Sequence, residues 1–260
     1  MVSNMLSCRI GSYGKFALYS YEHLSEIGVR NIECPIPKGR AETENLREIL
    51  EDFDLNVASF QVNFDPLKAN IFSDQVDHVV DTAGFFNTKV IFSSIKAPDW
   101  EKRREKLFSQ LRILGDAFQQ NGLRLCMETH PNLVTNGSVG RQTMEEINHP
   151  AIKINFDTAN MYYYNEDIDL LEELDLVLDW IGSVHLKDTS GEFKTWNFPT
   201  LGDGIVDFKA VVNKLTGIGF KGPYTMEIEG IKGEELDLNQ TKKRISNSVT
   251  YIDPILEDSS

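Results

Sequence analysis

Residues 123–130, LRLCMETH, are a short apolar run that ends in a carboxylate and a histidine. The same pattern, an apolar run that ends in charged or polar residues, recurs in residues 152–160 (IKINFDTAN), 181–188 (IGSVHLKD) and 222–230 (GPYTMEIEG). The polar side chains at the ends of these runs are Glu128, Asp157, His185 and Glu227. Their spacings are 29, 28 and 42 residues; the first two match one strand-plus-helix unit, and the third indicates a longer loop. Because parallel strands gather function at their carboxyl ends, we expect the four side chains to meet in an active site.

Outward from these runs, the whole chain alternates between β-rich and amphipathic segments in eight units. The predicted strands are 6–10, 29–34, 55–60, 89–93, 123–128, 152–157, 181–186 and 223–228. The predicted helices are 20–27, 43–52, 69–87, 99–121, 143–148, 168–179, 207–217 and 238–249. Eight such units predict an α/β protein of the (β/α)8 TIM barrel class, and we expect residues 1–260 to form a single domain.

Local signals predict where several helices begin and end. The segment TMEE at 143–146 has the form of a capping box, which predicts a helix start there. Gly115 and Gly122 lie where a helix would loosen or end. The C-terminal residues DPILEDSS are expected to fray after Pro254.

The charge of the chain argues against nucleic acid as a partner. The formal net charge is −14, whereas nucleic-acid binding requires a basic surface. The basic run KRREK at 102–106 falls within a predicted helix, where it is interpreted as a solvated outer face.

Hydropathy and cysteine content predict a cytoplasmic protein with no membrane partner. No stretch approaches the roughly 18 apolar residues that a membrane helix needs, and the N-terminal sequence lacks the apolar segment of a secretory signal. Cys8, Cys34 and Cys126 are an odd number and lie in apolar runs, so reduced buried thiols are expected.

The side chains at the four strand ends have the composition of a catalytic metal site. Three carboxylates and one imidazole suit Mn²⁺ first, with Mg²⁺, Co²⁺ and Zn²⁺ as alternatives, and they leave coordination positions for substrate oxygens. The alternative is coincidence, because the chain has 40 acidic residues and such residues at strand ends are often solvated loop carboxylates. We predict one bound divalent cation.

Strand alternation predicts which further side chains share this face, since residues two apart point the same way. His130 then accompanies Glu128, Lys187 accompanies His185, and Glu229 accompanies Glu227 as a rim carboxylate. His130 is a candidate base for a proton next to a carbonyl, with a loop-capping role beside Pro131 as the alternative. Lys187 is a candidate for neutralising an oxyanion, or else it forms a structural ion pair at the rim.

Three residues are candidates for contacting a small carbohydrate. Glu33 ends the second predicted strand and either binds a sugar hydroxyl or serves the barrel mouth structurally. Asn160 can donate to and accept from a hydroxyl, or stabilise its loop. Trp196, on a predicted loop at the mouth, can cover the apolar face of a sugar ring, although packing is the commoner use of such a side chain.

The motifs METHPN, NFDTAN, SVHLKD, LGDGIVDF and MEIEG resemble the xylose-isomerase-like TIM barrel superfamily of sugar phosphate isomerases and epimerases. The resemblance runs over nearly the whole chain and is strongest from Leu125 to Gly230. It implies one divalent cation held by Glu, Asp, His and Glu on the fifth to eighth strands. On this chain those ligands are Glu128, Asp157, His185 and Glu227.

Departures from the family pattern leave the reaction open. Ketose 3-epimerases of this group have a histidine three residues after the aspartate ligand and an arginine six after the histidine ligand, whereas this chain has Asn160 and Gly191. The Glu-x-His arrangement at Glu128 and His130 is similar instead to that of dehydratases and lyases of the family, including dehydroshikimate dehydratases and enzymes acting on keto-glycosides.

We therefore predict a metal-dependent enzyme that removes a proton next to the carbonyl of a keto-sugar or keto-polyol and isomerises or epimerises it through a metal-stabilised enolate. Glu128 and Glu227 would then act as acid and base. One alternative is β-elimination by a lyase, with His130 as the base. Another is a non-catalytic sugar-binding barrel, and a homo-oligomer or a partner subunit is compatible with either. An apurinic endonuclease, which shares this barrel, is disfavoured by the five histidines and the acidic charge.

Overall fold

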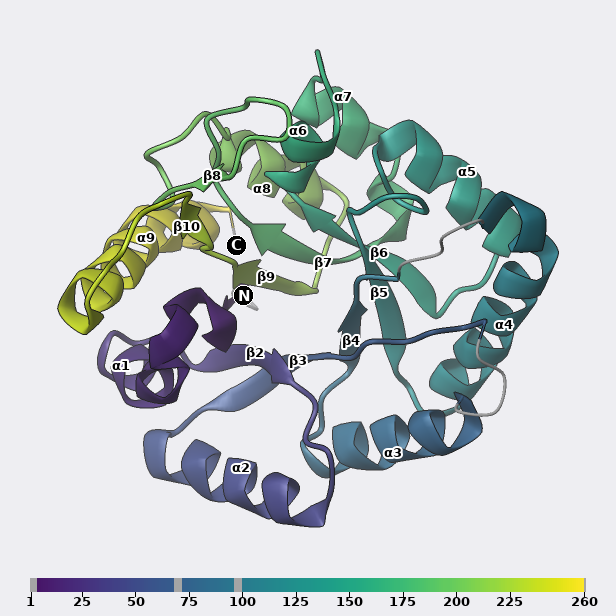
Figure 1. Cartoon of the computed structure of the whole chain (residues 1–260), viewed down its shortest axis with the longest axis horizontal. Helices are drawn as coiled ribbons and strands as arrows, with labels where there is room; N and C mark the ends of the chain where they lie inside the picture. The colour runs from purple at the N-terminus through teal and green to yellow at the C-terminus, as the bar shows by residue number, and fades with distance from the viewer. Residues whose placement is uncertain (1–3, 68–71, 96–99, 260) are drawn as a thin grey trace.

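The computed structural model describes residues 4–67, 72–95 and 100–259. Within them, eight parallel strands close into a barrel, in the order β1-β2-β3-β4-β5-β6-β7-β9 (Figure 1). The barrel strands are β1 (Met5–Arg9), β2 (Asn31–Pro35), β3 (Asn56–Gln61), β4 (Val90–Ser93), β5 (Arg124–Glu128), β6 (Ile152–Asp157), β7 (Ile181–Leu186) and β9 (Pro223–Met226). The predicted (β/α)8 TIM barrel is confirmed.

Helices form an outer ring around the strands (Figure 1). They are α1 (Ser20–Glu26), α2 (Arg40–Phe53), α3 (Phe72–Phe85), α4 (Trp100–Gln120), α5 (Gly137–Ile147), α6 (Asn160–Tyr164), α7 (Leu170–Asp175), α8 (Phe208–Gly217) and α9 (Leu238–Asp258), with the 3-10 segments η1 (Ile10–Tyr19) and η2 (Leu178–Trp180). Residues 69–71 and 99, at the starts of two predicted helices, lie outside the described residues. None of the helices in the described ranges is both long and apolar enough to span a membrane.

Most strands alternate between an apolar outer face and a polar inner face, although β4 directs Phe92 inward against His185. On β5, Leu125 and Met127 belong to the apolar core that the helices cover. The inner face carries Asn155 on β6 and Ser183 on β7, whose side chains share a buried hydrogen bond of 2.6 Å. These residues lie two positions before Asp157 and His185, so strand periodicity places the latter on the same inner face, one layer nearer the carboxyl end.

Two predictions about helix ends are wrong. Thr143 is buried inside α5 and does not cap it; the N-cap is Asn136, whose side chain accepts from the Val139 N–H at 2.9 Å. The C-terminal residues do not fray after Pro254, because α9 continues to Asp258 and buries Leu256. The helix α5 starts earlier because Asn136 is a cap that was not predicted from the sequence, whereas α9 is extended by packing against the barrel. Of the two predicted glycine breaks, Gly115 lies inside α4, but Gly122 follows the end of this helix at Gln120 and has a positive φ of 67°.

A small antiparallel ladder stands apart from the barrel sheet. It pairs β8 (Asn197–Phe198) with β10 (Gly230–Ile231). It therefore joins the long loop after β7 to the loop after β9, two segments that follow the carboxyl ends of barrel strands.

Candidate metal centre and active site

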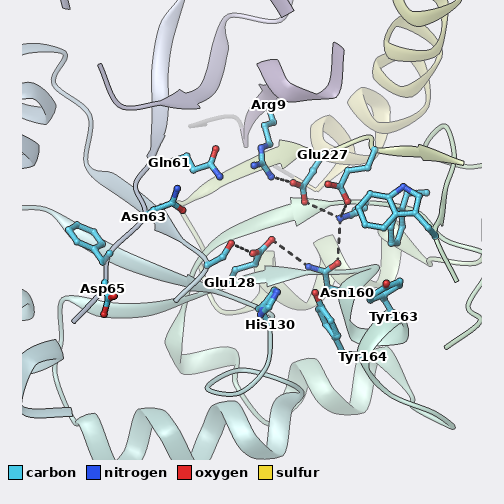
Figure 2. Close-up of a pocket in the computed structure, with 16 residues that line it drawn as sticks. Arg9, Gln61, Asn63, Asp65, Glu128, His130, Asn160, Tyr163, Tyr164 and Glu227 are labelled. Carbon is cyan, nitrogen blue, oxygen red and sulfur yellow. Dashed lines mark hydrogen bonds and ion pairs between the residues drawn. The ribbon is translucent and has the colours of Figure 1, made fainter. Parts of the chain in front are cut away.

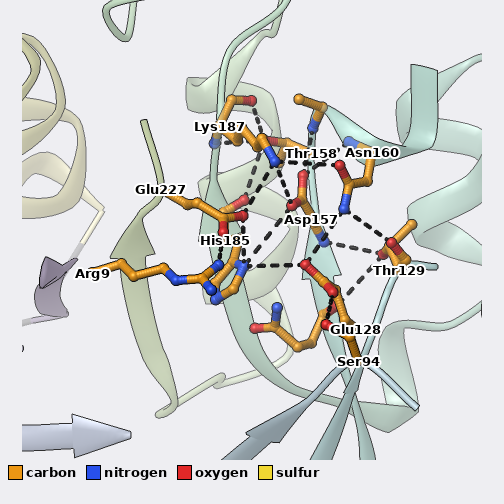
Figure 3. A network of polar contacts seen from close by, with 12 residues as sticks. Arg9, Ser94, Glu128, Thr129, Asp157, Thr158, Asn160, His185, Lys187 and Glu227 are labelled. Atoms are coloured by element: carbon orange, nitrogen blue, oxygen red, sulfur yellow. Dashed lines mark hydrogen bonds and ion pairs between the residues drawn. The ribbon is translucent and has the colours of Figure 1, made fainter. Parts of the chain in front are cut away.

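The four predicted metal ligands converge at the carboxyl end of the barrel. Glu128, Asp157, His185 and Glu227, here called the ligand cluster, are all buried, and one ligand atom of each lies within 4.8 Å of the others. The Nδ1 atom of His185 is 3.2 Å from the nearer Glu227 oxygen and 3.9 Å from oxygens of Glu128 and Asp157 (Figure 3). The register pairs Asp157 with His185 on adjacent strands, which explains why residues so distant in sequence meet.

Two atoms of the ligand cluster point inward without a hydrogen-bond partner among the described residues: His185 Nδ1 and Asp157 Oδ2. The other ring nitrogen of His185, Nε2, lies 3.1 and 3.3 Å from the two carboxylate oxygens of Glu33. Because a carboxylate accepts, Nε2 donates and the lone pair of the neutral ring is on Nδ1. Buried polar atoms are normally satisfied, so these two atoms and their geometry fit a cation ligated by oxygen and imidazole nitrogen.

Two cationic side chains contact this carboxylate-rich centre. Arg9 forms an ion pair with Glu227 and lies 3.9 Å from Glu33. Lys187 lies 3.3 Å from Glu227 and 3.7 Å from Asp157, and it also pairs with Glu229. The carboxylates outnumber these two cations. The surplus negative charge favours binding of a further cation.

Burial and neighbouring charges act in opposite directions on the centre. Burial raises the pKa of Glu128 above its ordinary value, which the charges of His185 and Lys187 only partly offset. For Asp157, burial opposes ionisation, but Lys187 and His185 outweigh it and lower its pKa. Burial also opposes the charge on His185, yet Glu33 and then Asp157 raise its pKa to about 9. Metal binding must therefore displace a proton wherever the imidazole is charged.

The ligand cluster opens into a cavity of about 580 Å³, here called the first pocket (Figure 2). Glu128 and Glu227 lie on its wall. The other lining residues are Arg9, Gln61, Asn63, Phe64, Asp65, Ser94, His130, Asn160, Tyr163, Tyr164, Lys187, Trp196, Phe198 and Glu229. The volume is within the range of small-ligand sites, and the wall combines aromatic faces with groups that can bind hydroxyls.

Strand alternation correctly predicts that His130, Lys187 and Glu229 face the first pocket. The Nδ1 atom of His130 is 2.7 Å from the backbone oxygen of Pro131. A carbonyl oxygen only accepts, so Nδ1 carries the proton and the lone pair of the neutral ring is on Nε2. Tyr164 packs edge-on against the ring with a centroid separation of 5.0 Å. His130 thus contacts the loop and also lines the first pocket.

Asn160 and Lys187 are both tied to the ligand cluster. Asn160 donates from Nδ2 to Thr129 O at 3.1 Å and accepts from Lys187 Nζ at 3.4 Å. The ammonium of Lys187 also lies 4.3 Å from the centroid of the Phe198 ring. Both residues hold the centre together and also line the first pocket, so the structural and substrate-contacting interpretations are compatible.

The other two substrate-binding candidates have different environments. Glu33 is buried behind His185, bonded also to Ser59 at 2.6 Å, and it is not among the described residues that line the first pocket. The structure therefore favours its structural role over direct contact with a sugar. Trp196 is 41% exposed, and its indole packs edge-on against Phe198 and Tyr163 at centroid separations of 5.1 and 6.2 Å. It is available to a ligand.

Three residues that shape the site were not predicted from the sequence. Arg9 is the last residue of β1. It could have been identified as a polar residue at the carboxyl end of a strand, as the four metal ligands were. Ser94, which donates to Glu128, follows β4 in the same way. Asp188 had no signal of its own beyond its place in the motif SVHLKD, because its partners are backbone groups of a distant loop segment.

The fold and the sequence together define the class of protein. The family described as xylose isomerase-like TIM barrel matches residues 21–250, so the chain belongs to this family. The chain is 27% identical to an inosose dehydratase of Geobacillus thermodenitrificans over 161 residues, covering 55% of this chain and 51% of that protein. It is 32% identical to the L-ribulose-5-phosphate 3-epimerase UlaE of Escherichia coli over 99 residues, covering 38% and 33%.

The chain therefore spans about half the length of the first relative and a third of the second. Both relatives are enzymes, and the predicted membership of this family is confirmed. A solved structure of a xylose isomerase-like TIM barrel protein from Mycobacterium smegmatis, in complex with magnesium, is similar with a TM-score of 0.78 and 16% identity. The match covers 99% of this chain and 98% of that one and supports the fold.

Proposed function

We propose that the protein is a divalent-metal-dependent enzyme that removes a proton next to the carbonyl of a keto-sugar or keto-polyol and so isomerises or epimerises it. The observation that carries the proposal is the ligand cluster. It presents two buried ligand atoms that make no hydrogen bond to the described residues, His185 Nδ1 and Asp157 Oδ2, beside a ligand-sized pocket. Matched relatives that act as an epimerase and a dehydratase support it.

Residues of the ligand cluster would hold the metal, and residues of the pocket wall would handle the substrate. A bound divalent cation would polarise the substrate carbonyl and acidify the adjacent C–H bond. In epimerisation, one of Glu128 and Glu227 acts as the base and removes the proton from one face of the substrate. The other acts as the acid and returns a proton to the opposite face. Lys187, beside Glu227, hydrogen-bonds a substrate oxygen as negative charge develops there.

A second candidate reaction is β-elimination, in which His130 takes the proton and a leaving group departs from the neighbouring carbon. The tautomer of His130 favours it, because the bond from Nδ1 to Pro131 leaves Nε2 as the basic atom of a pocket residue. The identity of residue 160 also supports elimination. This chain has Asn160 three residues after the aspartate ligand, where the typical ketose 3-epimerase of the family has a histidine. Substrate contacts are assigned to Asn160 and Trp196 in both cases.

Manganese is the proposed native ion, with magnesium, cobalt and zinc as alternatives. Residues 1–260 are proposed to form a single domain that acts in the cytoplasm on a small carbohydrate, without nucleic-acid or membrane partners. A homo-oligomer or a partner subunit remains compatible with this arrangement.

Incubation of the manganese-loaded protein with a panel of keto-sugars and keto-polyols in deuterated water tests the proposal. NMR then distinguishes exchange at the carbon next to the carbonyl, an epimer, an aldose or ketose, and an eliminated product. Exchange or product that requires the metal is the expected result. A panel without exchange or product at saturating manganese would instead favour the non-catalytic sugar-binding barrel.

A further inference from the structure

A second cavity of about 500 Å³, here called the second pocket, adjoins the first. The two share Trp196 and Glu229 as lining residues. The remaining wall comes from η1, from the loop between β9 and α9, and from Thr241 and Arg244 of α9. The elements η1 and α9 lie near opposite ends of the chain and contact each other in space (Figure 1). Ser12 in η1 accepts from the Ile228 N–H at 2.9 Å, which fixes the two walls to each other.

Trp196 is held in place as the partition between the cavities. Its backbone oxygen accepts from Lys232 N at 3.0 Å within the β8–β10 region, and its ring packs against Phe198 and Tyr163 on the side of the first pocket. Because Trp196 lines both pockets, it offers an aromatic surface to groups on either side.

The lining of the second pocket has the chemistry of carbohydrate recognition. The half-buried Phe16 of η1 contributes an aromatic side chain in addition to Trp196. Glu229, Glu234 and Glu235 contribute carboxylates that can accept hydrogen bonds from hydroxyls. Two cations also line this pocket: Arg244 pairs with Glu234, and the Lys15 ammonium lies 5.2 Å from the centroid of the Phe16 ring. The three carboxylates outnumber these cations, so together with the aromatic side chains they suit an uncharged polyhydroxylated ring better than a phosphate.

We propose that the substrate is an uncharged two-ring molecule, a keto-sugar that carries a second hydroxylated ring. The keto-sugar occupies the first pocket and the second ring occupies the second pocket, with Trp196 between them. This inference rests on the proposed function, and it adds the substrate class. Each cavity is large enough for one small ligand, and their shared walls make a single bridging molecule the natural occupant of both.

Isothermal titration of the manganese-loaded protein with two probes tests the inference: D-fructose, a single-ring ketose, and lactulose, which is fructose bearing a galactosyl ring. Lactulose is expected to bind at least about tenfold more tightly, which corresponds to roughly 1.4 kcal/mol. In Phe16→Ala the ratio of the two Kd values should move toward one. Leu18→Ala is the matched control, because Leu18 lies in the same segment, is 83% exposed and lines neither pocket.

A second variant guards against loss of folding, since Phe16 packs partly against the core. Glu235→Trp places a bulky ring at an exposed position of the second pocket and should also reduce the ratio. Equal Kd values for the two probes, no binding of either one, or a ratio unaffected by both variants would overturn the inference. Exchange of deuterium into a single-ring ketose would still support the proposed function, so the two failures are distinguishable.

Discussion

At the scale of single residues, His130 and His185 show how one hydrogen bond determines what an imidazole can do. In His185, Nε2 donates a hydrogen bond to Glu33, and Nδ1 faces the centre. In His130, Nδ1 donates a hydrogen bond to Pro131 O, so the lone pair of the neutral ring is on Nε2. The same side chain is therefore prepared as a ligand in one place and as a candidate base in the other.

Replacing His130 by glutamine separates the two candidate reactions. If the enzyme eliminates, turnover on its substrate should fall by about 10²- to 10⁴-fold, the usual contribution of a positioned base. Bound manganese, measured by elemental analysis, should stay at the wild-type level because His130 is outside the ligand cluster. His78→Gln is a matched control, since His78 also bonds a proline oxygen, that of Pro37. Unchanged turnover in His130→Gln would leave the loop-capping role.

Glu33 is predicted to orient His185 for the metal. Glu33→Gln keeps the size of the side chain and removes the charge, so manganese affinity should fall by about 10- to 100-fold. Equilibrium dialysis followed by elemental analysis measures this affinity. Glu48→Gln, at an exposed position on α2, is the control and should bind as the wild type does. A variant with wild-type affinity would contradict the orienting role.

At the scale of elements, the loop between β7 and α8 is organised by one buried carboxylate. Asp188 accepts from the backbone N–H groups of Gly202 and Gly204, both at 2.9 Å. It also accepts from those of Thr189 at 2.9 Å and Val206 at 3.2 Å. A Cβ at Gly204 would meet Asp188 Oδ1 at 2.2 Å, so glycine is needed for this close approach. The loop that carries Trp196 is thereby closed on itself.

Asp188→Asn should loosen this loop. One oxygen becomes an NH₂ group that faces N–H donors, leaving buried donors unsatisfied at about 1–3 kcal/mol each. Urea unfolding should report a loss of at least that size, and manganese affinity should change little. Asp203→Asn, at an exposed position of the same loop, should have wild-type stability. Equal stability of Asp188→Asn and the wild type would contradict the role of Asp188.

At the scale of the whole molecule, the first and last helices meet through a buried histidine. His23 on α1 lies 2.7 Å from the hydroxyl of Tyr13 through Nδ1 and 3.1 Å from Ser246 Oγ on α9 through Nε2. Burial, and then the charge of Lys242, lower the pKa of His23 below its ordinary value of 6.5, although Glu26 opposes this. The folded protein therefore favours the neutral ring.

This lowered pKa predicts a loss of stability in mild acid. As the pH falls below about 6.5, the unfolded chain takes up a proton that the folded state resists, so the free energy of unfolding decreases. The contribution of His23 is fully present above pH 6.5 and is lost as the pH falls toward the folded pKa. Between pH 7.5 and 5, the melting temperature of the wild type should therefore fall relative to that of His23→Gln. Identical pH dependences would contradict the assignment.

The sequence by itself determined the barrel and the four side chains of the ligand cluster. Both follow from local rules, because a strand directs every second residue to the same face and a repeated strand-plus-helix unit returns to the same edge of the sheet. The alternation that links Glu128 to His130 and His185 to Lys187 was correct for the same reason. Helix ends were predicted less accurately. For α5 the cap is Asn136 rather than Thr143, and for α9 packing against the barrel continues the helix beyond Pro254.

Only the tertiary structure decided the partners of these side chains. The pairing of Arg9 with Glu227, the bond from His185 to Glu33 and the two pockets on either side of Trp196 join residues from distant parts of the chain. No local pattern encodes such contacts, because they depend on how the barrel closes and how its loops pack. Barrel closure is what brings β1 beside β9 and gives the ligand cluster its surroundings.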